Sequence, residues 1–302
     1  MTNQNSRTPL MDSKALMMLF ALGAIWGGSF FFARIAVAEF HPLMLVALRV
    51  SIAALALHIW LVARGINFFA HRASFPAFLV LGLVNNVIPF SLIFYGQTEI
   101  GAGLAAILNA TTPFWTALLA NAVTSDEKLK ANLIGGILVG VAGTVILLGP
   151  SLLFDQGRPL WPKLSIIGAT LSYAVAAVFA KRFKLTNPSI TAAGQLTAST
   201  LWMIPIVALT GTFSVTATSH VWLAVLALAV LSTAFAYILY FSVIARAGAT
   251  NGSLVTLIVP ISAILLGALF LGERLIMSDF IGMAVIAIGF ILIDGRVLQR
   301  KI

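Results

Sequence analysis

The feature that most constrains this chain is an apolar stretch with a central proline that occurs twice. Residues 103–127 and 250–273 are each apolar over the length of a helix, and each ends on a glutamate. Their prolines are Pro113 and Pro260. A proline lacks an N–H, so a helix that continues through it leaves the carbonyl four residues earlier without its partner. The chain therefore repeats one interrupted helix.

Polar side chains occur at the level of these interruptions. The freed carbonyls belong to Asn109 and Thr256, and a third proline, Pro89, frees that of Asn85, with Asn86 beside it. In lipid, such groups are tolerated only where protein or a water-filled cavity satisfies them. Helix kinks satisfied by neighbouring helices would explain the pattern. A cavity is favoured, because interrupted helices at matching places in two halves indicate a transporter's binding site.

Composition restricts the class of protein. The chain has 302 residues, of which 60% are hydrophobic and 9% charged, whereas soluble domains carry about 25% charged residues. We therefore expect a polytopic membrane protein without a sizeable soluble domain. The net charge of +9 fits basic cytoplasmic loops better than nucleic-acid binding. The absence of cysteine excludes disulfides, thiolate metal sites and cysteine nucleophiles.

Ten segments are predicted to cross the membrane, which makes the fold class all-α. A span needs about 20 predominantly apolar residues. The predicted spans are 15–37, 42–63, 75–97, 101–121, 133–148, 162–181, 188–210, 220–244, 250–271 and 280–293. The fifth and tenth are short and glycine-rich, which suits close helix packing.

The distribution of Lys and Arg predicts the orientation. With the N-terminus inside, 13 of the 18 basic residues lie on the inner side, four lie on the outer side and Arg49 lies within a span. Basic residues concentrate in cytoplasmic loops, so we expect both termini in the cytoplasm and the protein in the inner (plasma) membrane.

The two halves of the chain resemble each other. Residues 88–149 are similar to 233–295 almost throughout, and more faintly Arg49 corresponds to Gln195. Five spans per half is an odd number, so the second half is expected to be inverted, with a substrate site near the midplane. The predicted organisation is a tail (1–14), a first repeat (15–149), an outer linker (150–161), a second repeat (162–295) and a tail (296–302).

These motifs resemble a known family. A proline-centred apolar helix ending in an acidic loop, as in LGERL, followed by a glycine-rich span, resembles the EamA repeats of the drug/metabolite transporter superfamily; the first copy departs from the motif, with SDEKL. The opening segment AIWGGSFFFARIAV is also similar to that family, and the whole chain is most similar to its YddG-type aromatic amino acid exporters. The resemblance implies ten helices in a basket-like bundle and export of small metabolites by alternating access.

Charged groups are almost absent from the predicted spans. Every Asp and Glu lies in a loop or at the end of a span, so we expect no intramembrane carboxylate for ion coupling. Arg49 is the exception among the charged residues. Two interpretations of it stay open: it contacts a substrate carboxylate, or it is structural, snorkelling outward or pairing with Glu39 or Glu99.

The polar and aromatic residues of the predicted spans make up the candidate cavity. An environment of amides, hydroxyls and aromatic rings suits a small amphipathic solute. The candidate cavity residues are Trp26, Asn85, Asn86, Tyr95, Asn109, Thr112, Trp115, Tyr173, Tyr237, Tyr240 and Thr256, with Arg49 as a carboxylate contact and Pro89, Pro113 and Pro260 as helix kinks. For each of them, packing against a neighbouring helix is the alternative.

The sequence thus predicts a transporter that exports small metabolites, amino acids including aromatic ones among them. A broad drug exporter and a nucleotide-sugar-like exchanger remain alternatives. An intramembrane enzyme would need a catalytic constellation that the chain lacks. We expect no catalytic residue, cofactor, metal or nucleic-acid partner, a small molecule and the lipid bilayer as partners, and an oligomeric state that the sequence leaves open, a monomer included.

Overall fold

The computed structural model describes residues 13–123, 131–148, 159–183, 188–240, 242–243, 246 and 255–294. Almost all of the predicted tails, most of the linker 150–161 and the end of the first proline-centred stretch lie outside these ranges. Within the described ranges the chain is helical and contains no strand.

The helices before the linker begin the fold. They are α1 (Ser13–Ala36), α2 (Pro42–Ala63), η1 (Phe68–Ser74), α3 (Phe75–Gly82), η2 (Leu83–Val87), α4 (Ile88–Gln97), α5 (Ala102–Asn109), α6 (Thr112–Val123) and α7 (Ala131–Leu148). Those after it are α8 (Trp161–Phe183), α9 (Pro188–Thr210), α10 (Ser219–Leu226), η4 (Ala227–Phe235), α12 (Val255–Leu271) and α13 (Met277–Asp294).

Seven helical segments of the described chain are long and apolar enough to cross a membrane. They are Ser13–Ala36, Pro42–Ala63, Phe68–Gln97, Ala102–Val123, Trp161–Ala180, Pro188–Thr210 and Ser219–Tyr240. Three shorter apolar helices are Ile134–Ile146, Ile258–Leu271 and Met277–Gly289. Each predicted span overlaps one of these segments, and the predictions 42–63 and 188–210 agree residue for residue with α2 and α9.

The predicted span 101–121 is two helices rather than one. α5 ends at Asn109 and α6 begins at Thr112. Pro113 offers no N–H to the Asn109 carbonyl, which instead accepts a hydrogen bond of 2.7 Å from the Thr112 hydroxyl. The Thr111 hydroxyl donates to the Leu108 carbonyl, also at 2.7 Å. The Thr112 hydroxyl therefore satisfies the carbonyl that Pro113 leaves free. By contrast, α12 continues through Pro260.

The third predicted span of each half contains wide helical turns. η2 precedes Pro89 in the first half, and η4 occupies the matching span of the second half. There the Thr233 hydroxyl donates to the Leu228 carbonyl, five residues earlier, at 2.8 Å. Such π-type turns are rare and frequently mark functional sites. The sequence indicated the first through its proline, whereas the second has none.

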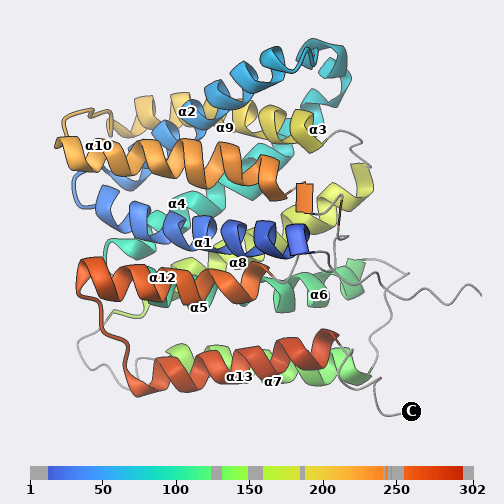
Figure 1. The fold of residues 1–302 in the computed structure, drawn as a ribbon, viewed down its shortest axis with the longest axis vertical. Helices are drawn as coiled ribbons and strands as arrows, with labels where there is room; N and C mark the ends of the chain where they lie inside the picture. Colours follow the sequence, from blue (N-terminus) through green and yellow to red (C-terminus); the bar gives the residue numbers. More distant parts are fainter. Residues whose placement is uncertain are drawn as a thin grey trace, which may run out of the picture.

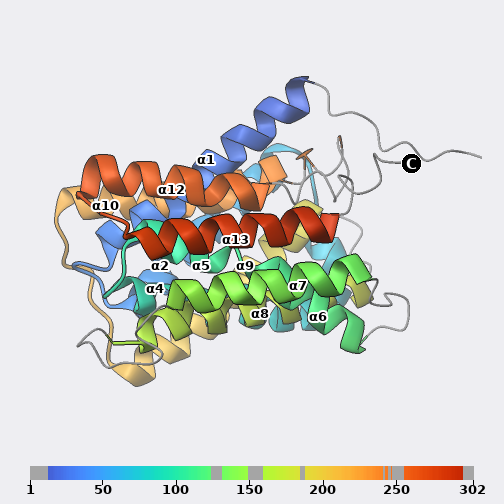
Figure 2. The ribbon, with the colours of Figure 1, turned by 90° about the horizontal axis from the view of Figure 1, so that it is seen from below.

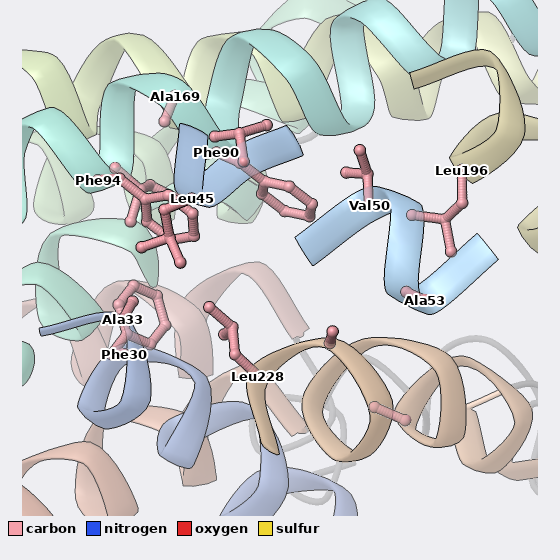
Figure 3. Close-up of a cluster of buried hydrophobic side chains, with 14 of the residues drawn as sticks. Phe30, Ala33, Leu45, Val50, Ala53, Phe90, Phe94, Ala169, Leu196 and Leu228 are labelled. Carbon is pink, nitrogen blue, oxygen red and sulfur yellow. The ribbon is translucent and has the colours of Figure 1, made fainter. Parts of the chain in front are cut away.

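Helices from the two halves pack against each other throughout. The most extensive contacts join α7 with α13, α1 with α12, α2 with α9 and α4 with α8. Figures 1 and 2 both show α7 and α13 side by side, at the lower edge of the bundle in Figure 1, where most helix axes run in one general direction. A buried apolar cluster lies between α1, α2, α4 and the α10–η4 segment (Figure 3). Each half therefore depends on the other for its core.

The contact between α1 and α12 requires glycine. A Cβ atom on Gly27 would lie 2.7 Å from the Val259 carbonyl oxygen and 2.8 Å from the Ala263 nitrogen, both backbone atoms of α12. Gly23 lies one turn earlier, and its carbonyl accepts a hydrogen bond of 2.9 Å from Ser262. Small residues let helices approach closely in membranes, as they do here.

We predict that Gly27→Ala lowers the melting temperature of the detergent-purified protein. Overpacking costs about 1–3 kcal/mol, which outweighs the gain of about 1 kcal/mol from better helix propensity. Gly135→Ala is the matched control, because an added Cβ meets nothing within 4 Å there, and it should not lower the melting temperature. Equal melting temperatures for the two variants would contradict the packing argument.

Candidate functional site

A cavity of about 330 Å³ lies between helices of both halves. It lies beside the interruption between α5 and α6, and beside the wide helical turns η2 and η4. Nine of the residues singled out from the sequence contribute to its lining. They are Trp26, Arg49, Asn85, Asn109, Thr112, Tyr173, Tyr237, Tyr240 and Thr256.

Three other candidates lie outside this lining. Asn86 is fully buried, where its amide donates to Ser199 Oγ at 3.0 Å and accepts a bond of 3.3 Å from the Tyr237 hydroxyl. Successive helical residues differ by about 100° in direction, so Asn86 packs on α9 while Asn85 reaches the cavity. The Tyr95 ring meets the edge of His41, and Trp115 Nε1 donates to Thr111 within its own segment. None of the three predicted kink prolines, Pro89, Pro113 and Pro260, lines the cavity either.

One face of α4 completes the cavity, and the sequence reasoning missed it. Phe90, Ile93, Phe94 and Gln97 are three or four residues apart and all line the cavity. This spacing was available as a signal. Gln97 is the last residue of its predicted span, and the amide residues of the cavity were predicted from their positions near prolines. The remaining lining residues are Ser29, Phe30, Ala106, Ala110, Ser232, Thr233 and Val259.

Arg49 neither snorkels outward nor pairs with a carboxylate. Its side chain is 7% exposed, Nε donates to Thr233 Oγ1 at 3.0 Å, and the guanidinium carbon lies 3.7 Å from the centre of the Phe90 ring. Stacking on an aromatic face is favourable for a cation. Among the described residues, no carboxylate lies within ion-pair distance of the guanidinium. A cation is therefore held in the cavity wall without a counter-ion from the described chain.

Glu39, which the sequence offered as a partner for Arg49, binds elsewhere. Its carboxylate accepts hydrogen bonds from the backbone N–H of Thr218 at 2.6 Å and from the Thr218 hydroxyl at 2.7 Å. The bond from the backbone N–H, together with that from the hydroxyl, lowers the pKa of Glu39. Glu39 thus joins the α1–α2 loop to the start of α10. Glu99, the other proposed partner, lines a separate hollow.

Two hydrogen bonds between the halves involve residues at equivalent positions of the repeat. Arg49 on α2 binds Thr233 in η4, and Gln195 Oε1 on α9 accepts a bond of 3.0 Å from Asn85 in η2. The sequence repeat pairs Arg49 with Gln195. Each of these two residues therefore holds the wide turn of the opposite half, and only one of them is charged. The positive charge of this pair therefore lies on α2, and the matching position on α9 is neutral.

Two amide oxygens of the lining residues have no hydrogen-bond donor in the part of the chain that the structure describes. Gln97 Nε2 donates to the Phe30 carbonyl at 2.8 Å, while its Oε1 is buried without a partner in the described chain. The same is true of Asn109 Oδ1. Buried polar atoms are nearly always hydrogen-bonded, so unpaired ones call for an explanation.

A hollow of about 1490 Å³ lies at one end of the bundle, and residues next to each other in the chain line it and the cavity. Gln97 lines the cavity and Thr98 lines the hollow. Between them, Arg34 on α1 donates to the backbone carbonyls of both residues. The described atoms around the hollow include charged side chains of both signs, and no group of three or more His, Cys, Asp or Glu within the described ranges is arranged to hold a metal.

The glutamate of the LGERL motif has a structural explanation. Glu273 accepts hydrogen bonds from the backbone N–H groups of Ala102 at 2.7 Å and Gly103 at 3.1 Å. These are free N–H groups at the start of α5, where a carboxylate is favourable. The motif thus joins the end of α12 to the beginning of α5, at the rim of the hollow.

Comparison with known proteins places these features in context. The model of the EamA-like transporter family matches residues 13–149 and again 160–294. The uncharacterized inner membrane transporter YedA of Escherichia coli K12 is 27% identical over 91% of this chain and 89% of its own length. A probable amino-acid metabolite efflux pump of the same organism is 26% identical over 92% of this chain and 94% of its own. A crystal structure covering 96% of this chain and 99% of its own shares the fold, with a TM-score of 0.68 at 22% identity.

Asn86 and Asn109 should respond differently to the same substitution. We predict that Asn86→Leu destabilises the protein by about 1–3 kcal/mol, because Ser199 and Tyr237 lose a buried partner. Asn109→Leu removes an oxygen that has no hydrogen-bond donor among the described residues, so it should change stability by less than about 0.5 kcal/mol while slowing solute transport. Denaturation in detergent micelles measures the first effect and flux in liposomes the second. A greater loss of stability for Asn109→Leu than for Asn86→Leu would contradict this assignment.

Proposed function

Since this chain belongs to the EamA-like transporter family, we propose that it exports small metabolites, amino acids including aromatic ones among them, by exposing the cavity alternately to the two sides of the membrane. The observation that carries the proposal is the cavity itself. It lies between the two halves, beside interrupted helices, and its lining combines aromatic rings, hydroxyls and amides. Transporter sites are built in this way.

The proposed architecture is a bundle of ten spans in two inverted repeats, 15–149 and 162–295. Its support is the double match of the family model and the pairing of helices across the halves, α1 with α12, α2 with α9 and α7 with α13. Each half can then close one end of the cavity against the other. The layer formed by Arg34, Gln97 and Phe30 serves as the closure toward the large hollow.

We propose an inner-membrane location with both termini in the cytoplasm. The loop 64–74 carries Arg64 and Arg72, whereas the loop 211–218 carries no basic residue. Figure 1 shows these loops at opposite ends of the bundle. Cytoplasmic loops collect basic residues, so the end with 64–74 faces the cytoplasm and the large hollow faces outward.

The chemistry of the cavity supports amino acids and related metabolites as substrates. Phe90, Phe94 and the pair Trp26–Tyr240, whose ring centroids are 5.1 Å apart, offer aromatic surface. This surface suits apolar or aromatic side chains, and the relative named as an amino-acid metabolite efflux pump favours the same class. A broad drug exporter would use the same rings. A nucleotide-sugar exchanger is less well supported, because Arg49 is the one cation in the lining formed by described residues, too few for a diphosphate.

We predict that transport needs neither a proton gradient nor sodium. The described residues lining the cavity include no carboxylate, which ion-coupled carriers commonly use. In liposomes that contain the purified protein, counterflow of radiolabelled L-phenylalanine should proceed at equal pH on both sides and without sodium. Protein-free liposomes provide the control. An absolute requirement for a pH difference or for sodium would contradict the proposal of uncoupled exchange, whereas no flux of any amino acid would contradict the proposed function.

A further inference from the structure

We propose that Arg49 and Gln97 act together as specificity-determining residues, Arg49 receiving a substrate carboxylate and Gln97 Oε1, with Asn109 Oδ1, receiving its ammonium group. The cavity would then accept solutes that carry both groups and discriminate against those that lack either. This inference rests on the proposed function of the same cavity and refines it.

Arg49 has unused donors in a buried position. Its side chain is 7% exposed, and within the described chain only Nε has a hydrogen-bond acceptor, Thr233 Oγ1. The two terminal nitrogens have no acceptor among the described residues, although they carry four N–H donors. A guanidinium removed from water without an anion is strongly disfavoured, and a carboxylate that accepts two parallel hydrogen bonds is its best partner.

Gln97 has an unused hydrogen-bond acceptor, whereas Arg49 has unused donors. The side chain is fully buried, and its Nε2 donates to the Phe30 carbonyl. This bond fixes the amide orientation, because the flipped amide would set its oxygen against a carbonyl oxygen. Oε1 is thereby presented as an acceptor without a donor, and Asn109 Oδ1 is a second one. An ammonium group offers three donors, enough for both oxygens.

The unused donors and the unused acceptors belong to residues that line the same cavity. Unused donors belong to Arg49 on α2, and unused acceptors belong to Gln97 on α4 and Asn109 on α5. A ligand with a carboxylate and an ammonium group satisfies both sets, whereas a simple anion or amine leaves one set buried and unpaired. Phe90 and Phe94, on the same face of α4 as Gln97, provide surface for an apolar substituent.

The two halves differ at the position of Arg49, and this difference determines the orientation of the bound solute. The position that corresponds to Arg49 in the other half is Gln195, which accepts a hydrogen bond from Asn85 and does not line the cavity. The two halves therefore do not offer a carboxylate equivalent partners. With one arginine, the carboxylate binds at the η4 side of the cavity.

Competition binding to the wild-type protein tests the requirement for both groups. Radiolabelled L-phenylalanine bound to the detergent-purified protein is displaced by L-phenylalanine, by 3-phenylpropionate, which lacks the ammonium group, or by 2-phenylethylamine, which lacks the carboxylate. We expect each analogue to compete at least about tenfold more weakly than L-phenylalanine, because each leaves one buried set unpaired. If either analogue competes as well as L-phenylalanine, or if no amino acid binds, the inference is overturned.

Single variants then assign each preference to its residue. Arg49→Gln should abolish the preference for L-phenylalanine over 2-phenylethylamine but keep its preference over 3-phenylpropionate. Gln97→Met should reduce the preference for L-phenylalanine over 3-phenylpropionate but keep its preference over 2-phenylethylamine. Thr200→Val on α9 is the control and should leave both ratios unchanged, since the Thr200 hydroxyl donates to the Leu196 carbonyl of its own helix and Thr200 does not line the cavity. Ratios that do not move in Arg49→Gln or Gln97→Met overturn the assignment, and the wild-type competition remains decisive if a variant fails to fold.

The inference and the proposed function fail separately. Counterflow of L-phenylalanine in liposomes without discrimination among the three compounds would retain the transporter and overturn the recognition pair. Discriminating binding without any flux in liposomes would support the recognition pair and contradict the transport function.

Discussion

Every backbone polar group within the hydrocarbon region must find its partner inside the protein, and the structure depends on how this chain meets that demand where its helices are interrupted. Between α5 and α6, the Thr112 hydroxyl bonds the Asn109 carbonyl that Pro113 leaves free, and the Thr111 hydroxyl adds a bond to the Leu108 carbonyl. In η4 the Thr233 hydroxyl likewise donates to the Leu228 carbonyl. Side-chain hydroxyls thus contribute hydrogen bonds where the backbone departs from regular helix, and the cavity lies beside these departures.

The same places carry the contacts between the halves. Arg49 holds η4 through Thr233, and Gln195 holds η2 through Asn85. A movement of one half against the other therefore acts directly on the irregular turns that border the cavity. The hydrogen bonds of Arg34 and Gln97 join α1 to the end of α4, between residues that line the cavity and residues that line the large hollow.

Much of the fold could be predicted from the sequence, because apolar runs bounded by polar turns determine helix ends in lipid. α2 and α9 agree residue for residue with their predictions, helped by Pro42 and Pro188 at their first positions. The break in span 101–121 was indicated by Pro113, yet the equivalent Pro260 leaves α12 continuous. A proline removes one helical hydrogen bond in both places, so the proline alone did not predict which helix would break. Asn85 could be separated from Asn86, and Gln97 recognised, only once the rotation of each helix about its axis was known.

The central claim is that one cavity is reached from both sides of the membrane, and cysteine accessibility measures it directly. Ser29 lines the cavity, and the chain has no cysteine, so Ser29→Cys introduces a single thiol. Exposed cysteines replacing Ser214 in loop 211–218 and Ala70 in loop 64–74 provide outer and inner standards. A membrane-impermeant thiol reagent should label Ser29→Cys in right-side-out and in inside-out vesicles, and L-phenylalanine should slow both reactions. Labelling from one side alone, or from neither, in vesicles whose standards react as assigned would contradict alternating access.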